Sequence, residues 1–139
     1  MSSLLITGGA GFIGSNLVQY ALAQTADPIV VVDKVTYAAN PHSIAAWAKE
    51  PRVTFVQGDI ADRPLMEAVV EQHRPHAILN LAAETHVDRS IDSPQAFLDT
   101  NVVGTFTLLE VARRYSGALA PVARGAFRFL PGNLVIWPT

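Results

Sequence analysis

The sequence has 139 residues, of which 50% are apolar and 16% charged, a composition typical of one globular domain and not of a disordered segment. The formal net charge is −2 and the 10 basic residues are scattered, which excludes the basic cluster that nucleic-acid binding requires. There is no cysteine, and neither a signal peptide nor a membrane span can be recognised, so we expect a cytoplasmic protein.

Short apolar runs alternate with longer amphipathic stretches along the chain. Four of these runs predict strands, at residues 4–6, 29–32, 53–56 and 77–81. Helices are expected after the first run, around residues 43–49, and from Asp62, which can cap a helix that runs to about residue 73. Strands that alternate with helices predict an α/β fold with a doubly wound, Rossmann-like parallel sheet.

The C-terminal quarter predicts one long helix and one further strand. Ser93 and Pro94 are a cap followed by a first-turn proline, and the helix is expected to run to about residue 115. Its inward side should carry Phe97, Val102, Leu108, Leu109 and Ala112. Residues 127–130 predict a fifth strand before Pro131. We therefore expect an incomplete sheet of about five strands in a domain of residues 1–130, followed by a tail at 131–139.

A glycine-rich turn, TGGAGFIG from Thr7, stands between the first strand and its helix, which is the context that gives a glycine pattern its meaning. Gly8 can make the tight turn, Gly11 can leave room for a pyrophosphate, and Gly14 can let the helix lie close to the strand. The helix N-terminus adds partial positive charge. The pattern predicts a dinucleotide site, although its spacing of three and three differs from the commoner two and three.

An acidic residue, Asp33, ends the second strand, where a dinucleotide site needs a partner for the adenosine ribose. Its carboxylate would repel the 2′-phosphate of NADP, so NAD is the predicted cofactor, and the adjacent Lys34 opposes this preference. Asp59 follows the third strand, at the edge where adenine lies in such folds. Taken alone, Asp59 is more typical of a turn residue before a helix, and only its position relative to Asp33 favours the contact with the base.

Polar residues follow the fourth strand in the segment LAAETHVDRS, residues 81–90. Its small residues permit close approach of a cofactor where the strand order reverses. Glu84, Thr85, His86 and Arg89 can line a polar cleft; alternatively, Glu84 and Arg89 form a structural ion pair and His86 a structural hydrogen bond. Both interpretations remain open from the residues alone.

Two further polar pairs give weaker indications. Thr100 and Asn101 lie in mid-helix, where neither is favoured, so a contact toward the cofactor is expected. His73 and His76 flank a proline that breaks any shared helical face, and no third ligand is near in sequence, so we expect no metal site.

Residues 4 to about 130 resemble the dTDP-glucose 4,6-dehydratases of the extended short-chain dehydrogenase/reductase superfamily. The resemblance rests on the stretches TGGAGFIGSN, VVDKVTYAAN, GDI, LAAETHVDRSI, TNVVGTFTLLE and FRFL. It implies a dTDP-sugar substrate, oxidised at C4 by NAD, dehydrated across C5 and C6, and reduced again at C6. It also implies a homodimer through helices that include the one at 94–115.

The resemblance also implies the residues that contact each ligand. NAD contacts are expected at Phe12, Ile13, Asp33, Lys34, Thr36, Asp59, Ile60, Leu81, Ala82, Ala83 and Thr100. Thr85 is expected beside the glucosyl group, with Glu84 and His86 in the same substrate-binding segment.

The resemblance stops after FRFL, where the family continues into a Thr-Asp-Glu triplet, a Tyr-x-x-x-Lys pair and a sugar-nucleotide domain. The 3 tyrosines here are followed four residues later by Gln24, Pro41 and Leu119. We therefore expect no catalytic residues and no dehydratase activity from this chain alone. Our hypothesis is a truncation or frameshift product; the alternatives are a non-catalytic NAD-binding regulatory module and a subunit completed by another chain.

Overall fold

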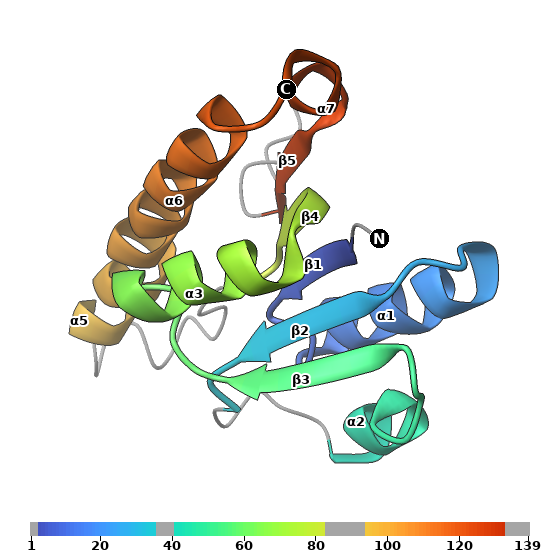
Figure 1. Cartoon of the computed structure of the whole chain (residues 1–139). Helices are drawn as coiled ribbons and strands as arrows, with labels where there is room; N and C mark the ends of the chain where they lie inside the picture. The colour runs from blue at the N-terminus through green and yellow to red at the C-terminus, as the bar shows by residue number, and fades with distance from the viewer. Residues whose placement is uncertain (1–2, 36–40, 83–93, 133–139) are drawn as a thin grey trace, which may run out of the picture.

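The computed structural model describes residues 3–35, 41–82 and 94–132, which form a single five-stranded sheet with helices on both faces (Figure 1). The strand order is β3-β2-β1-β4-β5, and every neighbouring pair is parallel. The strands are β1 (Ser3–Thr7), β2 (Ile29–Asp33), β3 (Val53–Gln57), β4 (Pro75–Asn80) and β5 (Arg128–Pro131). The predicted doubly wound, Rossmann-like sheet is confirmed.

Helices α1 and α2 cover one face of the sheet, and α3 and α6 cover the other (Figure 1). The helical segments are α1 (Phe12–Gln24), α2 (Pro41–Trp47), α3 (Arg63–His73), α5 (Pro94–Phe97), the π-helix η1 (Leu98–Gly104), α6 (Thr105–Gly117) and α7 (Pro121–Ala126). Among the described residues, none of these helices combines the length and the apolar character needed to cross a lipid bilayer.

Alternation along the strands divides the core into two clusters. Leu5 packs with the residues of α3 and α6, whereas Ile6, its neighbour in β1, packs with α1 and α2. Successive side chains of a strand point to opposite faces, so one strand contributes to both clusters. The apolar residues of β2, at positions 29–32, are all buried because helices cover both faces of this strand.

The predicted cap of α3 is present. Asp62 is the N-cap residue, and its side chain accepts a hydrogen bond of 3.2 Å from the backbone N–H of Leu65. Met66, Val69 and Val70 then face the core, which places α3 against α6 across the same face of the sheet. The cap thus begins the helix directly after the loop that leaves β3.

The long helix predicted from residue 94 differs from the structure in its inward side. Leu108 and Ala112 are buried as expected, but Val102 is 59% exposed and Leu109 is 41% exposed, so these two predictions were wrong. Leu109 lies in α6 directly after buried Leu108, and consecutive residues of an α-helix do not share a face. Val102 lies in η1, a π-helix of seven residues between α5 and α6. A π-helix has more residues per turn than an α-helix, so a periodicity of 3.6 assigns the wrong side.

The predicted fifth strand is confirmed at the edge of the sheet. β5 pairs with β4, and its last residue, Pro131, lies opposite Asn80. Proline lacks the N–H that a ladder needs, and an edge strand tolerates this loss. The preceding short helix α7 was not predicted, and its residues are all exposed.

Candidate functional site

The loops that follow β1, β2, β3 and β4 meet at one edge of the sheet. Thr7 lies opposite both Val32 and Asn80, and Asp33 lies opposite Gln57, so the carboxyl ends of these strands are level. The arrowheads of β2 and β3 show this edge in Figure 1. The strand order reverses between β1 and β4, and ligands bind at such a point in open parallel sheets.

The glycine-rich turn is held by close backbone contacts. Gly8 has a φ of +75°, which favours glycine, and a Cβ there would lie 2.5 Å from the backbone nitrogen of Ala82. A Cβ on Gly14 would overlap the carbonyl oxygen of Gly8. Gly14 was expected to let the helix approach the strand. In the structure its close contact is with Gly8 and Gly9, in the turn that follows β1. The first turn of α1 therefore rests directly on this backbone.

The N-terminus of α1 is open at this edge. Gly11 is its N-cap residue and offers no side-chain cap, and a Cβ on Gly11 would meet only the oxygen of Gly8, at an ordinary 3.5 Å. Phe12 and Ile13 are 75% and 67% exposed. Backbone N–H groups at a helix start favour an anion, so the room predicted beside Gly11 lies where a phosphate group can approach.

Asp33 connects two of the loops through its carboxylate. Oδ2 accepts a hydrogen bond of 2.9 Å from the N–H of Ala10, and Oδ1 accepts one of 2.7 Å from Val35. A carboxylate can accept about four hydrogen bonds, so both oxygens retain capacity for ribose hydroxyls. Val35 has a φ of 58°, a left-handed conformation that is unusual for a β-branched residue. Such strain occurs at ligand sites and was not visible in the sequence.

Three predicted cofactor residues from separate segments, Lys34, Asp59 and Thr100, contact one another after the carboxyl ends of β2 and β3. The ammonium of Lys34 lies 3.3 Å from Oδ2 of Asp59 and donates a hydrogen bond of 3.4 Å to the hydroxyl of Thr100, which is buried. Asp59 also accepts a 2.9 Å bond from the N–H of Ala61 through Oδ1, so it is a turn residue as well. The fold thus brings together side chains that are 25 and 66 positions from Lys34.

The remaining predicted residues are placed differently. The side chain of Ile60 is buried in the core, and a Cβ on Gly104 would lie 2.7 Å from its Cγ1 atom. Leu81 donates its N–H to Thr7, and Ala82 follows at the switch point. Several predicted residues lie outside the described part of the chain, namely Thr36, Ala83, Glu84, Thr85, His86 and Arg89.

Asn80 is a buried polar residue at the switch point that was not predicted from the sequence as a candidate for the site. It is fully buried at the end of β4, and its Oδ1 accepts hydrogen bonds from the Thr7 hydroxyl at 2.6 Å and the Ala82 N–H at 3.3 Å. No described residue accepts a hydrogen bond from its Nδ2. A buried donor without a partner costs about 1 to 3 kcal/mol, and native proteins contain only a few such groups. In the sequence, the feature that could have drawn attention to Asn80 is a single amide side chain at the end of an apolar strand.

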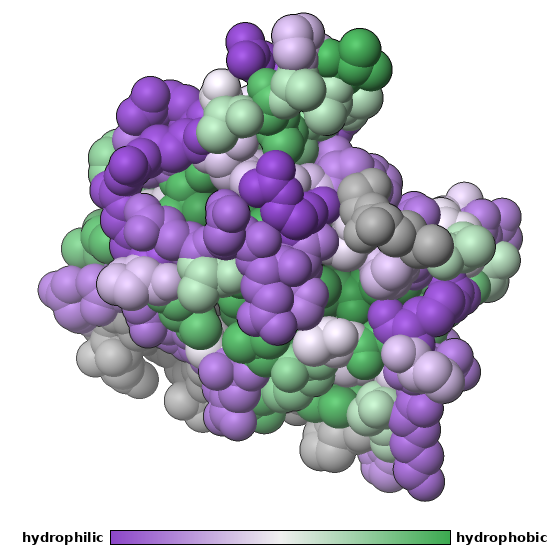
Figure 2. Space-filling view, in the orientation of Figure 1, coloured by the Kyte–Doolittle hydropathy of each residue, from purple (hydrophilic) through white to green (hydrophobic). Residues whose placement is uncertain are grey.

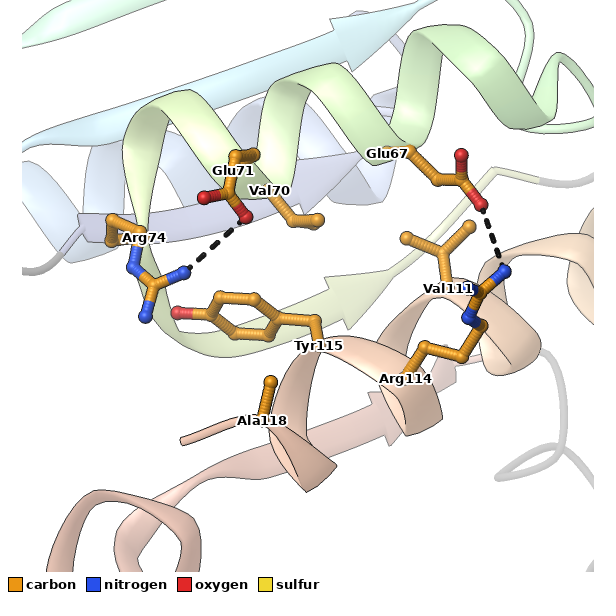
Figure 3. Close-up of a pocket in the computed structure, with 8 residues that line it drawn as sticks. All are labelled: Glu67, Val70, Glu71, Arg74, Val111, Arg114, Tyr115 and Ala118. Carbon is orange, nitrogen blue, oxygen red and sulfur yellow. Dashed lines mark hydrogen bonds and ion pairs between the residues drawn. The ribbon is translucent and has the colours of Figure 1, made fainter. Parts of the chain in front are cut away.

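A cavity of about 240 Å³ lies elsewhere, between the outer sides of α3 and α6 (Figure 3). Its floor is Tyr115, whose hydroxyl donates a 2.6 Å hydrogen bond to the carbonyl of Pro75, at the amino end of β4. Burial raises the pKa of this phenol, and the Arg74 guanidinium lies 5.0 Å from the ring centroid. Hydrophilic side chains cover most of this face (Figure 2). Because Tyr115 contacts the amino end of β4, the cavity is separate from the site at the carboxyl ends of the strands.

The described residues also contain no group of three His, Asp or Glu side chains close enough to hold a metal ion. His76 contacts a single carboxylate, with Nε2 at 3.2 Å from Oδ2 of Asp27.

Comparison with known proteins assigns the chain to a family. The family model described as GDP-mannose 4,6 dehydratase matches residues 5–130. The chain belongs to this family. The proteins similar to this chain include dTDP-glucose 4,6-dehydratase 1 of Escherichia coli (strain K12), which is 50% identical over 126 residues. The dTDP-glucose 4,6-dehydratase of Neisseria meningitidis serogroup B is also 50% identical, over 129 residues. The resemblance inferred from the sequence is confirmed.

The chain spans only part of these relatives. The two matches cover 91% and 93% of this chain but 35% and 36% of the enzymes. Among solved structures, DesIV, a dTDP-glucose 4,6-dehydratase from Streptomyces venezuelae with NAD and TYD bound, is 42% identical with a TM-score of 0.76. It is matched over 91% of this chain and 38% of its own. A UDP-glucose 4-epimerase from Thermotoga maritima is 31% identical with a TM-score of 0.72, over 81% of this chain and 34% of its own.

The contact between α1 and the turn predicts a large effect of one methyl group. Gly14→Ala should lower the free energy of unfolding by at least about 2 kcal/mol, because the Cβ meets the backbone of Gly8 and not a movable side chain. The matched control is Gly117→Ala in α6, where a Cβ meets nothing within 4 Å. The control should be neutral or stabilising by up to about 1 kcal/mol. Urea unfolding of the two variants measures the difference, and equal stability would contradict the packing described.

Proposed function

We propose that the carboxyl edge of the sheet binds NAD and is the cofactor site of a dTDP-glucose 4,6-dehydratase. The observation that carries the proposal is the Asp33 carboxylate, held by the N–H groups of Ala10 and Val35 beside the open start of α1. A pyrophosphate suits the helix N-terminus, and ribose hydroxyls suit the remaining lone pairs of Asp33. The similar DesIV structure contains NAD, which supports this choice of ligand.

Each part of the site has a separate task in this proposal. The N–H groups at the start of α1 bind and orient the pyrophosphate, and the exposed side chains of Phe12 and Ile13 lie in the same first turn. Asp33 fixes the adenosine ribose, and Asp59 lies at the adenine end. Bound NAD would supply a hydride acceptor for an alcohol carbon of the substrate.

The substrate half of the proposal rests on the relatives, which are named as dTDP-glucose dehydratases. We propose a dTDP-sugar as the substrate, with Glu84, Thr85 and His86 as its binding residues. These 139 residues contain no Tyr-x-x-x-Lys pair, so we expect them to bind NAD without turnover.

We also propose where the NAD-binding domain ends and where the protein acts. We place the boundary of the NAD-binding domain at residue 130, where the family match also ends. A chain without cysteine needs no oxidising compartment to fold, and we place its function in the cytoplasm.

Calorimetric titration with NAD and with NADP tests the cofactor assignment. The folded chain should bind NAD saturably and NADP more weakly. Asp33→Asn should weaken NAD binding about 10-fold or more, because hydrogen bonds to a charged group contribute about 1.5 to 3 kcal/mol. The control Glu71→Gln, in an exposed ion pair on α3, should bind NAD as the original chain does. A folded chain that binds no NAD would overturn the proposal.

A homodimer is the second part of the proposal, supported by exposed apolar side chains on η1 and α6. Leu98, Val102, Phe106 and Leu109 are all exposed on these two consecutive helical segments. Their side chains give two copies an apolar surface to bury. Sedimentation should show a dimer that Phe106→Glu converts to a monomer. Val122→Glu, the same change at an exposed residue of α7, should leave the dimer intact. A monomeric original chain would contradict this part.

A further inference from the structure

Asp33 and Lys34 are adjacent in sequence, but their side chains make contacts on different sides of β2. The Asp33 carboxylate accepts from Ala10, in the turn that leads into α1. The Lys34 ammonium lies with Asp59 and Thr100, beside the helices of the opposite face. The positive charge of Lys34 is therefore directed away from the carboxylate that is expected to face the ribose.

Asp59 is held in position to keep Lys34 there. Its Oδ1 accepts the N–H of Ala61 at 2.9 Å, and its carbonyl oxygen accepts the N–H of Asp62 at 2.9 Å. With the backbone turn and one carboxylate oxygen fixed, Oδ2 faces the Lys34 ammonium at 3.3 Å. Thr100, in η1, provides a second acceptor: its hydroxyl oxygen lies 3.4 Å from the Lys34 ammonium. A long flexible side chain is thus held by two partners that do not depend on the presence of a ligand.

This arrangement has a consequence for dinucleotide choice. A lysine free to rotate beside the ribose site could neutralise Asp33 and attract a 2′-phosphate, which carries nearly two negative charges. Paired with Asp59, the same lysine leaves the Asp33 carboxylate without a neutralising partner at the ribose site. We propose that Asp59 is a specificity-determining residue that makes the site reject NADP, by holding Lys34 away from the ribose 2′ position. The inference rests on the proposed NAD site and adds a second determinant to Asp33.

The test is the ratio of the NADP dissociation constant to the NAD dissociation constant, measured by calorimetry on the full 139-residue chain. Asp59→Asn should lower this ratio about fivefold, since one negative charge is removed and Lys34 is released. Asparagine keeps an oxygen for the N–H of Ala61, so the turn is retained. The control Glu71→Gln makes the same charge change in the exposed pair with Arg74 and should leave the ratio unchanged.

A double-mutant cycle separates the role of Lys34 from direct repulsion by Asp59. In a Lys34→Met background, Asp59→Asn should change the ratio by less than about twofold, because the charge it would release is gone. If Asp59→Asn lowers the ratio equally in both backgrounds, or does not lower it at all, the inference is overturned while NAD binding itself stands. If the folded original chain binds no NAD, both the inference and the proposed function fail.

Discussion

The Asp33 carboxylate accepts one backbone N–H from each of the two loops that follow β1 and β2. These loops are far apart in sequence, and the bond to Ala10 fixes the glycine-rich turn relative to the end of β2. The same two bonds orient both carboxylate oxygens at the edge of the sheet, before any ligand arrives. Preorganisation of this kind lowers the cost of binding, because the ordering of the site does not have to accompany the ligand.

The second constraint is steric and acts through glycine. The start of α1 lies on the carbonyl of Gly8, and Gly8 lies on the backbone that joins Leu81 to Ala82. A side chain at either glycine would separate these segments. The N-terminus of α1, the end of β4 and the Asp33 carboxylate therefore hold one relative arrangement, and the proposed positions of the pyrophosphate and the ribose follow from it.

Much of this arrangement could be predicted from the sequence because it depends on local patterns. The short valine-rich run of β2 is typical of a strand covered on both faces, and Asp33 then falls at its carboxyl end. The turn at Gly8 and the cap at Asp62 likewise follow from the residue types and their spacing.

The features that were missed depend on tertiary contacts. Val102 is exposed because it lies in the π-helix η1, and a 3.6-residue periodicity of apolar residues does not predict a π-helix. The buried amide of Asn80 has meaning only beside Thr7, which lies 73 positions earlier. The ion pair between Lys34 and Asp59 depends on the pairing of β2 with β3. The burial of Ile60 likewise depends on a distant residue, Gly104, that packs next to it.

The most direct measurement is an amide ¹⁵N–¹H NMR titration of the chain with NAD, because it locates the ligand as well as detecting it. The largest shifts should fall on the amides of Ala10 to Gly14, on Val35 and on the turn from Gly58 to Ala61. These amides surround the Asp33 carboxylate, the start of α1 and Asp59. Shifts centred instead on Glu71, Arg74 and Tyr115, which line the cavity between α3 and α6, would place the ligand elsewhere and contradict the assignment.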